Sequence, residues 1–352
     1  MKIAITADLH LTDRDRNPER FETLENLLAD LRAEDVNTLI IAGDLFDETR
    51  QNYAEFEQIL RRDENQEISI IAIPGNHDPT IDDRKIVADN LEIITTPTLR
   101  ELDGLPFLFL PYEAGTTMGE KIELYSDQLP ANNWVLVSHG DLVEGLRIPN
   151  PAESGVYMPL GRRDVATYIP ATVILGHIHA VTDSPPVHYV GSPCGIDITE
   201  TGRRKYVIYD TDAKQVERRD IKTPILYFIA SFVVVPVEDE ADHLRKLINE
   251  EKDKWNLKTD EIAKARIRVS IVGYSSDRSA LQDVLDEEFQ SFTFYKGERP
   301  SVRDVANSGD TDRHTIAQGV QEMVKGLDWP DGMDQPNEQD ILLAALHIIY
   351  GE

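Results

Sequence analysis

Metal-ligand side chains gather at five points of the sequence, each directly after a short apolar run. The sequence at these points contains Asp-Leu-His, Gly-Asp, Gly-Asn-His-Asp, Ser-His-Gly and Gly-His-Ile-His. The candidate residues are Asp8, His10, Asp44, Asn76, His77, Asp78, His139, His177 and His179. Carboxylate, imidazole and carboxamide groups together suit manganese, iron or zinc. Imidazole and carboxylate groups also serve as acids and bases in catalysis.

Each motif alone has an ordinary structural interpretation. Asp-x-His after a strand is often a polar turn, Gly-Asp is a common turn dipeptide, and a single histidine is more often structural than a ligand. Gly-Asn-His-Asp and Gly-His-x-His are more specific, and five such endings in one chain favour a joint metal site. The only cysteine is Cys194, which disfavours thiolate zinc and iron–sulfur sites. The number of candidate ligands indicates two ions about 3.5–4 Å apart, bridged by one carboxylate.

The elements that must position these residues are short strands. Continuous apolar runs occupy residues 3–7, 38–42, 68–73, 105–110, 134–137 and 172–175. Such runs are typical of strands covered on both faces, and helical spacing between several of them predicts a layered α/β fold. Because ligand sites in α/β sheets form at the carboxyl ends of strands, we expect the five endings to meet.

Composition limits the classes of function. The 352 residues carry 36 Lys and Arg against 64 Asp and Glu, a formal charge of −28. This charge argues against a broad basic surface, so nucleic-acid binding would need local basic clusters or metal ions. The sequence shows no leader-like segment and no apolar run long enough to span a bilayer, and its single cysteine suits a reducing compartment. We therefore expect a cytoplasmic protein without a membrane segment.

The second half of the chain predicts a further unit. Strand patterns at 226–235, 265–272 and 291–295 alternate with helical patterns at 238–256 and 278–289. Beyond residue 301 the sequence becomes polar and ends in two helical stretches, at 315–327 and 340–352. The predicted domains are therefore residues 1–222, 223–300 and 301–352.

The motif series resembles the calcineurin-like metallophosphoesterase superfamily over residues 1–210. Within that superfamily the chain is similar to the SbcD-type DNA exonucleases of double-strand-break repair. This narrower similarity lies in "GDLFDETR" at 43–50, "LPY" at 110–112 and "YVGSPCGIDITETGRRKYVIYD" at 189–210. The resemblance implies a layered β-sandwich flanked by helices, followed by a small α+β capping domain and a helical C-terminal tail.

The resemblance also implies an activity, that of a metal-dependent exonuclease or endonuclease in DNA repair or recombination. One ion would be held by Asp8, His10, Asp44 and His179, and the other by Asp44, Asn76, His139 and His177. We expect manganese, with magnesium, iron(II) and zinc as alternatives. His77 would contact the scissile phosphate, and Asp78 would either orient His77 or cap the loop. Many relatives carry histidine where this chain has Asp47, which leaves the strength and direction of exonuclease activity open.

The partners that the resemblance implies are DNA and an SMC-like ATPase subunit of the SbcC type. The tail, residues 301–352, would dock on the coiled coil of that ATPase; packing of the tail helix on its own domain is the alternative. A homodimer is a further expected association. Two rival functions stay open: a phosphodiesterase or phosphatase for small molecules such as cyclic nucleotides, and a non-catalytic scaffold. The scaffold is disfavoured because the chain retains every ligand and His77.

Overall fold

Contacts within the chain divide it into two units. The computed structural model describes residues 1–47, 53–82, 84–143, 155–308, 311–327, 329 and 337–350. The first unit comprises residues 1–196 and 203–225, and the second comprises 197–202 and 226–352. Residues 48–50 of the "GDLFDETR" motif and 330–336 of the expected tail lie outside the described residues.

The first unit contains two six-stranded mixed sheets. One has the order β14 (Gln215–Asp220), β13 (Lys205–Asp210), β1 (Lys2–Thr6), β2 (Thr38–Ala42), β3 (Ser69–Ile73) and β4 (Leu91–Ile93). The other has the order β11 (Thr182–Ser184), β12 (Val187–Tyr189), β10 (Thr172–Gly176), β7 (Val135–His139), β6 (Leu105–Leu110) and β5 (Thr98–Leu102). Their inner strands run parallel, so the carboxyl ends of β1, β2 and β3 share one edge, as do those of β7 and β10. A short pair, β8 (Leu142–Val143) and β9 (Leu160–Gly161), follows β7.

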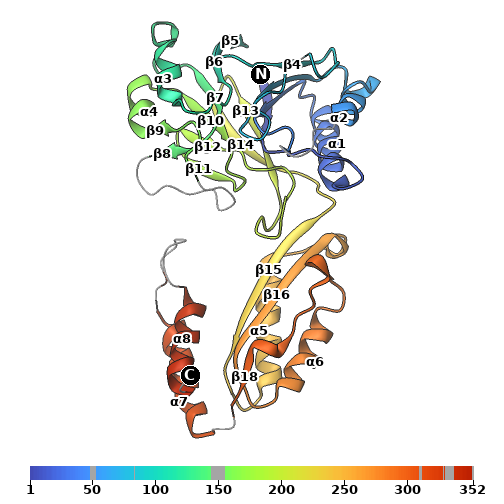
Figure 1. The fold of residues 1–352 in the computed structure, drawn as a ribbon, viewed down its shortest axis with the longest axis vertical. Coiled ribbons are helices and arrows are strands. Elements are labelled where there is room, and N and C mark those ends of the chain that lie inside the picture. Colours follow the sequence, from blue (N-terminus) through green and yellow to red (C-terminus); the bar gives the residue numbers. More distant parts are fainter. Residues whose placement is uncertain are drawn as a thin grey trace. The chain divides into compact units, whose positions relative to one another are not determined.

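Helices cover the outer face of each sheet (Figure 1). Helices α1 (Pro18–Ala33) and α2 (Tyr53–Leu60) share one apolar cluster with the first sheet. Helices α3 (Met118–Glu123) and α4 (Arg162–Tyr168) pack against the second sheet. A third cluster fills the space between the two sheets. The first unit is therefore a β-sandwich with a helical layer on each side.

Strand β2 shows why its sequence is apolar at every position from residue 39 to residue 42. Leu39 and Ile41 point into the cluster that contains α1 and α2, whereas Ile40 and Ala42 point into the centre of the sandwich. Because both faces of the strand are buried, neither set of alternating positions can be polar. The predicted mixed α/β fold, with sheets flanked by helices, is confirmed.

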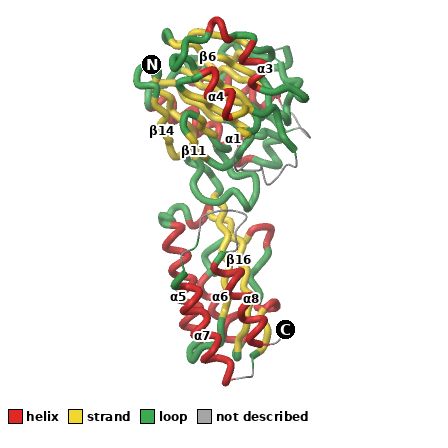
Figure 2. The backbone as a smooth tube through the Cα atoms, turned by 90° about the vertical axis from the view of Figure 1, so that its left-hand side faces the viewer, coloured by secondary structure: helices red, strands yellow, loops and turns green. Residues whose placement is uncertain are grey.

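The second unit is built on a separate four-stranded sheet (Figure 2). Strands β15 (Leu226–Val234), β16 (Ala265–Ser275) and β17 (Thr293–Phe294) are parallel neighbours, and β18 (Val305–Asn307) pairs with the end of β16. Helices α5 (Glu240–Trp255) and α6 (Arg278–Glu288) bury an apolar cluster on one face. Helices α7 (Thr311–Lys325) and α8 (Glu338–Tyr350) contribute to another cluster with β15 and β16.

Helix α8 covers part of the chain's own sheet. Leu342 and Leu346 are buried in a cluster that includes Val233 of β15 and Tyr274 of β16. The buried side of α8 thus packs within the second unit, as in the alternative considered for the tail helix. None of the helices in the described ranges is both long enough and apolar enough to cross a membrane.

Candidate metal centre

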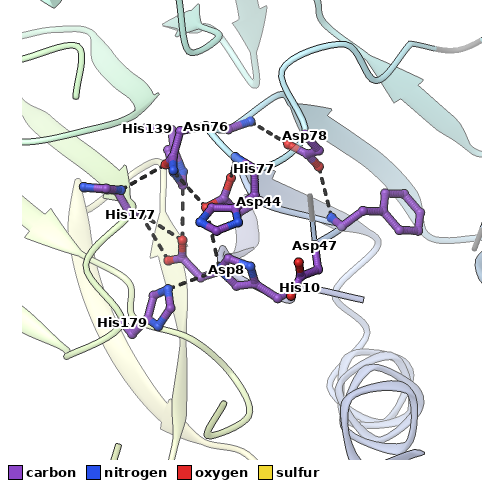
Figure 3. A network of polar contacts seen from close by, with 12 residues as sticks. Asp8, His10, Asp44, Asp47, Asn76, His77, Asp78, His139, His177 and His179 are labelled. Atoms are coloured by element: carbon purple, nitrogen blue, oxygen red, sulfur yellow. Dashed lines mark hydrogen bonds and ion pairs between the residues drawn. The ribbon is translucent and has the colours of Figure 1, made fainter. Parts of the chain in front are cut away.

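The predicted site residues come together in the first unit (Figure 3). They follow or end strands β1, β2, β3, β7 and β10, the five strands that the sequence places before the motifs. Six of the nine residues are buried and at most 3% exposed: Asp8, His10, Asp44, Asp78, His139 and His177. Asn76, His77 and His179 are half-buried. The site therefore combines a buried interior with a partly open side.

The backbone at the site is held in an unusual conformation. Asp8, His10, Asp44 and His177 have φ values of 54°, 45°, 50° and 89°, in the left-handed region that non-glycine residues rarely adopt. Each such residue costs roughly 1–3 kcal/mol and persists only when its surroundings hold it. Here the amide of Asp8 donates to Gly43 O at 3.1 Å and that of His10 donates to Asp44 O at 3.0 Å. The amide of His177 donates to Asp8 Oδ1 at 2.9 Å.

Two glycines let the ligand-bearing loops approach closely. A Cβ atom on Gly75 would lie 2.1 Å from Asp44 Oδ1, and one on Gly43 would lie 2.2 Å from His139 Nδ1. Gly43 also has a φ of +95°. No other residue type fits these positions without displacing Asp44 or His139.

One group of ligand atoms joins Asp8, His10 and His179, whose donor atoms all lie within 4.8 Å of one another. The Nε2 atoms of His10 and His179 face each other at 3.1 Å. Two imidazole nitrogens at this distance require either a proton or a cation between them, because neutral ring nitrogens without hydrogen carry lone pairs that repel.

The second group forms around His139. Its Nε2 lies 2.9 Å from Asn76 Oδ1 and 3.2 Å from Asp44 Oδ2, and His177 Nδ1 lies 3.0 Å from the same Asn76 oxygen. His139 Nδ1 lies 3.0 Å from the carbonyl oxygen of Ala42. Because a carbonyl can only accept, Nδ1 carries the hydrogen and Nε2 is the ligand atom, as in metal-binding histidines whose other nitrogen is anchored.

Burial and neighbouring charges shift the pKa values of these residues strongly. Burial lowers the pKa of His10 to about 3, which keeps the imidazole neutral and able to bind a cation. Burial also disfavours the charged form of His139, but the adjacent Asp44 carboxylate outweighs it and raises the pKa of His139 to about 10. Although burial favours the protonated form of Asp44, the nearby histidines hold its pKa below the usual range. Burial raises the pKa of Asp8 to about 6.

The chemistry of the donor set fits divalent cations. When His139 is neutral, its Nε2 and the oxygens of Asn76 and Asp44 all present lone pairs to one point. A cation at that point satisfies all three lone pairs, and a proton on His139 takes the place of the cation when none is bound, which is what the raised pKa of His139 reflects. Asp44 Oδ2 also lies 3.6 Å from His10 Nε2, so this carboxylate stands between the two groups of ligands. Oxygen and nitrogen donors without thiolate suit manganese, iron, zinc or magnesium.

His77 and Asp78 differ in their placement. The ring of His77 lies edge-on to that of His10, with ring centroids 4.7 Å apart, on the partly open side of the site. The backbone amide of His77 donates to Asp44 Oδ1 at 2.9 Å. Both carboxylate oxygens of Asp78 accept from backbone amides, from Gly75 at 2.8 Å and from Phe46 at 3.0 Å. Asp78 therefore ties together the two loops that carry Asp44 and His77, as a loop cap would.

Sequence reasoning missed several residues that surround the ligands. Asp141 is buried, with Oδ1 3.8 Å from His177 Nε2 and Oδ2 accepting from the amide of Tyr157 at 2.7 Å. The ring of Tyr157 lies 4.8 Å from that of His177. The position of Asp141, two residues after His139 at a strand end, is a signal that could have identified it. Asp47, which the sequence already singled out, lies 3.8 Å from the guanidinium of Arg20.

Comparison with known proteins identifies relatives of the first unit. The sequence profile of the calcineurin-like phosphoesterase family matches residues 1–181. No curated protein sequence matches the chain.

Three solved structures are similar to this chain at low identity. An archaeal phosphodiesterase has 18% identity and a TM-score of 0.35, covering 62% of this chain and 99% of its own. A dimetal phosphatase from Danio rerio has 11% identity and a TM-score of 0.38, covering 65% and 99%. The phosphopantetheinyl hydrolase of Mycobacterium tuberculosis has 15% identity and a TM-score of 0.30, covering 55% and 90%.

Proposed function

Because the chain belongs to the calcineurin-like phosphoesterase family, we propose that it is a two-metal phosphodiesterase that hydrolyses DNA, as SbcD-type nucleases do. The observation that carries the two-metal assignment is the position of Asp44. Its Oδ2 lies 3.6 Å from His10 Nε2 and 3.2 Å from His139 Nε2, where one carboxylate can serve two ions. Asp8, His10, Asp44 and His179 would hold one ion, and Asp44, Asn76, His139 and His177 the other.

The residues of the chain divide the work of phosphodiester hydrolysis between them. When bound, the two ions supply positive charge for the phosphate oxygens and acidify the attacking water. The side chain of His77 lies beside His10 on the partly open side, where it can donate a proton or a hydrogen bond to the phosphate. Asp78 keeps His77 in register with Asp44 through the backbone of Gly75 and Phe46.

DNA as the substrate rests on the similarity of "GDLFDETR" and of residues 189–210 to the SbcD-type nucleases, together with a second unit that has its own core. A small-molecule diester is the competing substrate. The non-catalytic scaffold finds no support, because all seven proposed ligands and His77 are present.

The proposal is tested with end-labelled linear and circular DNA in manganese, in magnesium and in chelator. A chromogenic phosphodiester is assayed in parallel, and His77→Ala serves as the inactive control. We expect degradation of DNA that requires the metal and is lost in the variant. Hydrolysis of the chromogenic diester or of a cyclic nucleotide without any cleavage of DNA would replace DNA by a small-molecule substrate. Metal uptake without hydrolysis of any diester would favour the scaffold.

We also propose an SMC-like ATPase as the partner, bound through the exposed side of the terminal helices. Support comes from four apolar side chains in or just after α7 and α8 that remain exposed: Ile316 at 57%, Met323 at 72%, Leu327 at 54% and Ile348 at 82%. Deleting the whole tail would be a poor test, since Leu342 and Leu346 belong to the core of the second unit. Instead, Met323→Glu with Ile348→Glu should abolish co-purification with the cognate ATPase while leaving the thermal midpoint unchanged. If this double variant still co-purifies with the ATPase, the exposed side of the terminal helices is not the docking surface.

A further inference from the structure

Two buried arginines hold the backbone of two opposed histidines. Arg20 and Arg204 are each only 6% exposed, although arginine is rarely buried unless it is paired. Arg20 donates through Nη1 to the carbonyl oxygen of His10, and Arg204 donates through Nη2 to the carbonyl oxygen of His179. His10 and His179 are the histidines whose Nε2 atoms face each other at 3.1 Å.

Arg20 contacts His10, whose backbone conformation is unfavourable without support from its surroundings. His10 has a φ of 45°, and its carbonyl would lose a hydrogen-bond partner if Arg20 were removed. Arg20 projects from α1, on the outer face of the first sheet, so it connects the helical layer to the loop after β1. Its guanidinium also lies 3.8 Å from the carboxylate of Asp47, which holds the side chain from a second direction.

Arg204 acts on the other histidine through a short loop. Its Nε donates to the carbonyl oxygen of Ser192 at 3.0 Å, and its Nη2 also donates to Ser192 Oγ at 2.6 Å. The amide of Ser192 in turn donates to the carbonyl oxygen of His179 at 3.1 Å. The planar, five-donor guanidinium can make all three contacts at once, whereas a lysine ammonium at this position could not reproduce their geometry.

We propose that Arg20 and Arg204 are positioning residues that set the separation of the His10 and His179 imidazoles and thereby form one of the two metal sites. The inference rests on the two-metal centre of the proposed function and adds two residues to it. Partners that orient metal ligands from behind typically contribute 10–100-fold to metal affinity. Each arginine acts through the histidine whose backbone carbonyl oxygen it binds.

Charge repulsion predicts the opposite change in metal affinity, so the direction of the measured change distinguishes the two effects. A guanidinium near a cation site repels the cation, so removing its charge should strengthen metal binding if charge dominates. Removing a positioning contact should instead weaken binding. The effect should also be confined to the site that contains His10 and His179, because the His139 group is anchored separately through Ala42.

The experiment titrates manganese into the metal-free full-length protein by calorimetry and follows its paramagnetic resonance spectrum. The variants are Arg20→Met, Arg204→Met, Arg20→Lys and Arg204→Lys. The matched controls are Arg32→Met, on the same helix but bonded to Asn65, and Arg218→Met, which pairs with Asp183 at 2.6 Å. We expect each methionine variant to weaken one of two manganese sites by about 10–100-fold, with the other site unchanged. The spin-coupled spectrum of the ion pair should give way to that of an isolated ion.

The lysine variants decide between positioning and general folding defects. They keep the positive charge and part of the hydrogen bonding, so we expect partial recovery of manganese affinity at the weakened site. We also expect a circular dichroism spectrum like that of the unaltered protein, even where a methionine variant fails to fold. Unchanged or tighter manganese binding in folded arginine variants would overturn the inference while leaving the two-metal proposal intact. Uptake of fewer than two ions by the unaltered protein would overturn both.

Discussion

Replacing Gly75 by alanine tests how tightly the metal centre is built without removing any ligand. The added Cβ would lie 2.1 Å from Asp44 Oδ1 and 2.4 Å from the backbone nitrogen of Asp44. Rotation of the Asp44 side chain alone cannot relieve both contacts, so the loop after β2 or the loop after β3 must move. Contacts below 3.0 Å are essentially never seen, so relative to the added Cβ the Asp44 Oδ1 atom must move by at least 3.0 − 2.1 = 0.9 Å and the Asp44 backbone nitrogen by at least 3.0 − 2.4 = 0.6 Å.

A shift of this size should affect function more than stability. Asp44 Oδ2 lies 3.2 Å from His139 Nε2 and 3.6 Å from His10 Nε2, so moving this carboxylate disturbs both groups of ligands. A misplacement of about 1 Å at a reacting centre can cost about 100-fold in rate. Overpacking of a dense interior costs about 1–3 kcal/mol, which the unit should survive.

The assay for Gly75→Ala combines manganese stoichiometry, turnover of a chromogenic diester and thermal unfolding. We expect at least a 100-fold loss of turnover with weaker uptake of manganese and a folded protein. Gly319→Ala is the matched control, since Gly319 is exposed on α7 with no atom within 4 Å of an added Cβ. That change should stabilise the helix by about 0.5–1 kcal/mol and leave metal binding unchanged. Wild-type manganese affinity and turnover in Gly75→Ala would refute the argument that this glycine sets the position of Asp44.

Three further perturbations have distinct expected outcomes. His77→Ala should keep both ions bound while turnover falls by about 10²–10⁴-fold, and unchanged turnover, measured alongside metal content, would show that His77 is only a loop residue. Leu346→Ala should destabilise the second unit by about 2–5 kcal/mol in denaturant unfolding, because Leu346 is buried. Ile348→Ala on the same helix should change stability by less than about 0.5 kcal/mol, because Ile348 is 82% exposed. Chelation should lower the stability of the first unit by about 2.7 kcal/mol for each ion that was present at 100 times its dissociation constant. A thermal midpoint that does not change on adding chelator would argue against ions held by the folded site.

The sequence by itself determined the kind of fold and the chemistry available to it. Residues 39–42 are apolar at every position, as expected of a strand buried on both faces, and the structure places alternate residues of β2 in two different apolar clusters. The ligand residues follow such runs, and parallel strands bring their carboxyl ends to one edge. The local pattern was therefore sufficient to predict that Asp8, Asp44 and His139 lie close together.

Only the tertiary structure decided which groups support that site and what each amphipathic helix covers. Asp78 could have oriented His77 or capped a loop, and the structure places its carboxylate on the amides of Gly75 and Phe46. The arginines behind His10 and His179 lie outside the five metal-ligand motifs. Helix α8 has an apolar face whose periodicity does not show which surface covers it. The periodic spacing of apolar residues predicts which face of a helix is buried, because that spacing can be seen in the helix's own sequence. The surface that buries it is set by long-range packing, which depends on the whole chain at once.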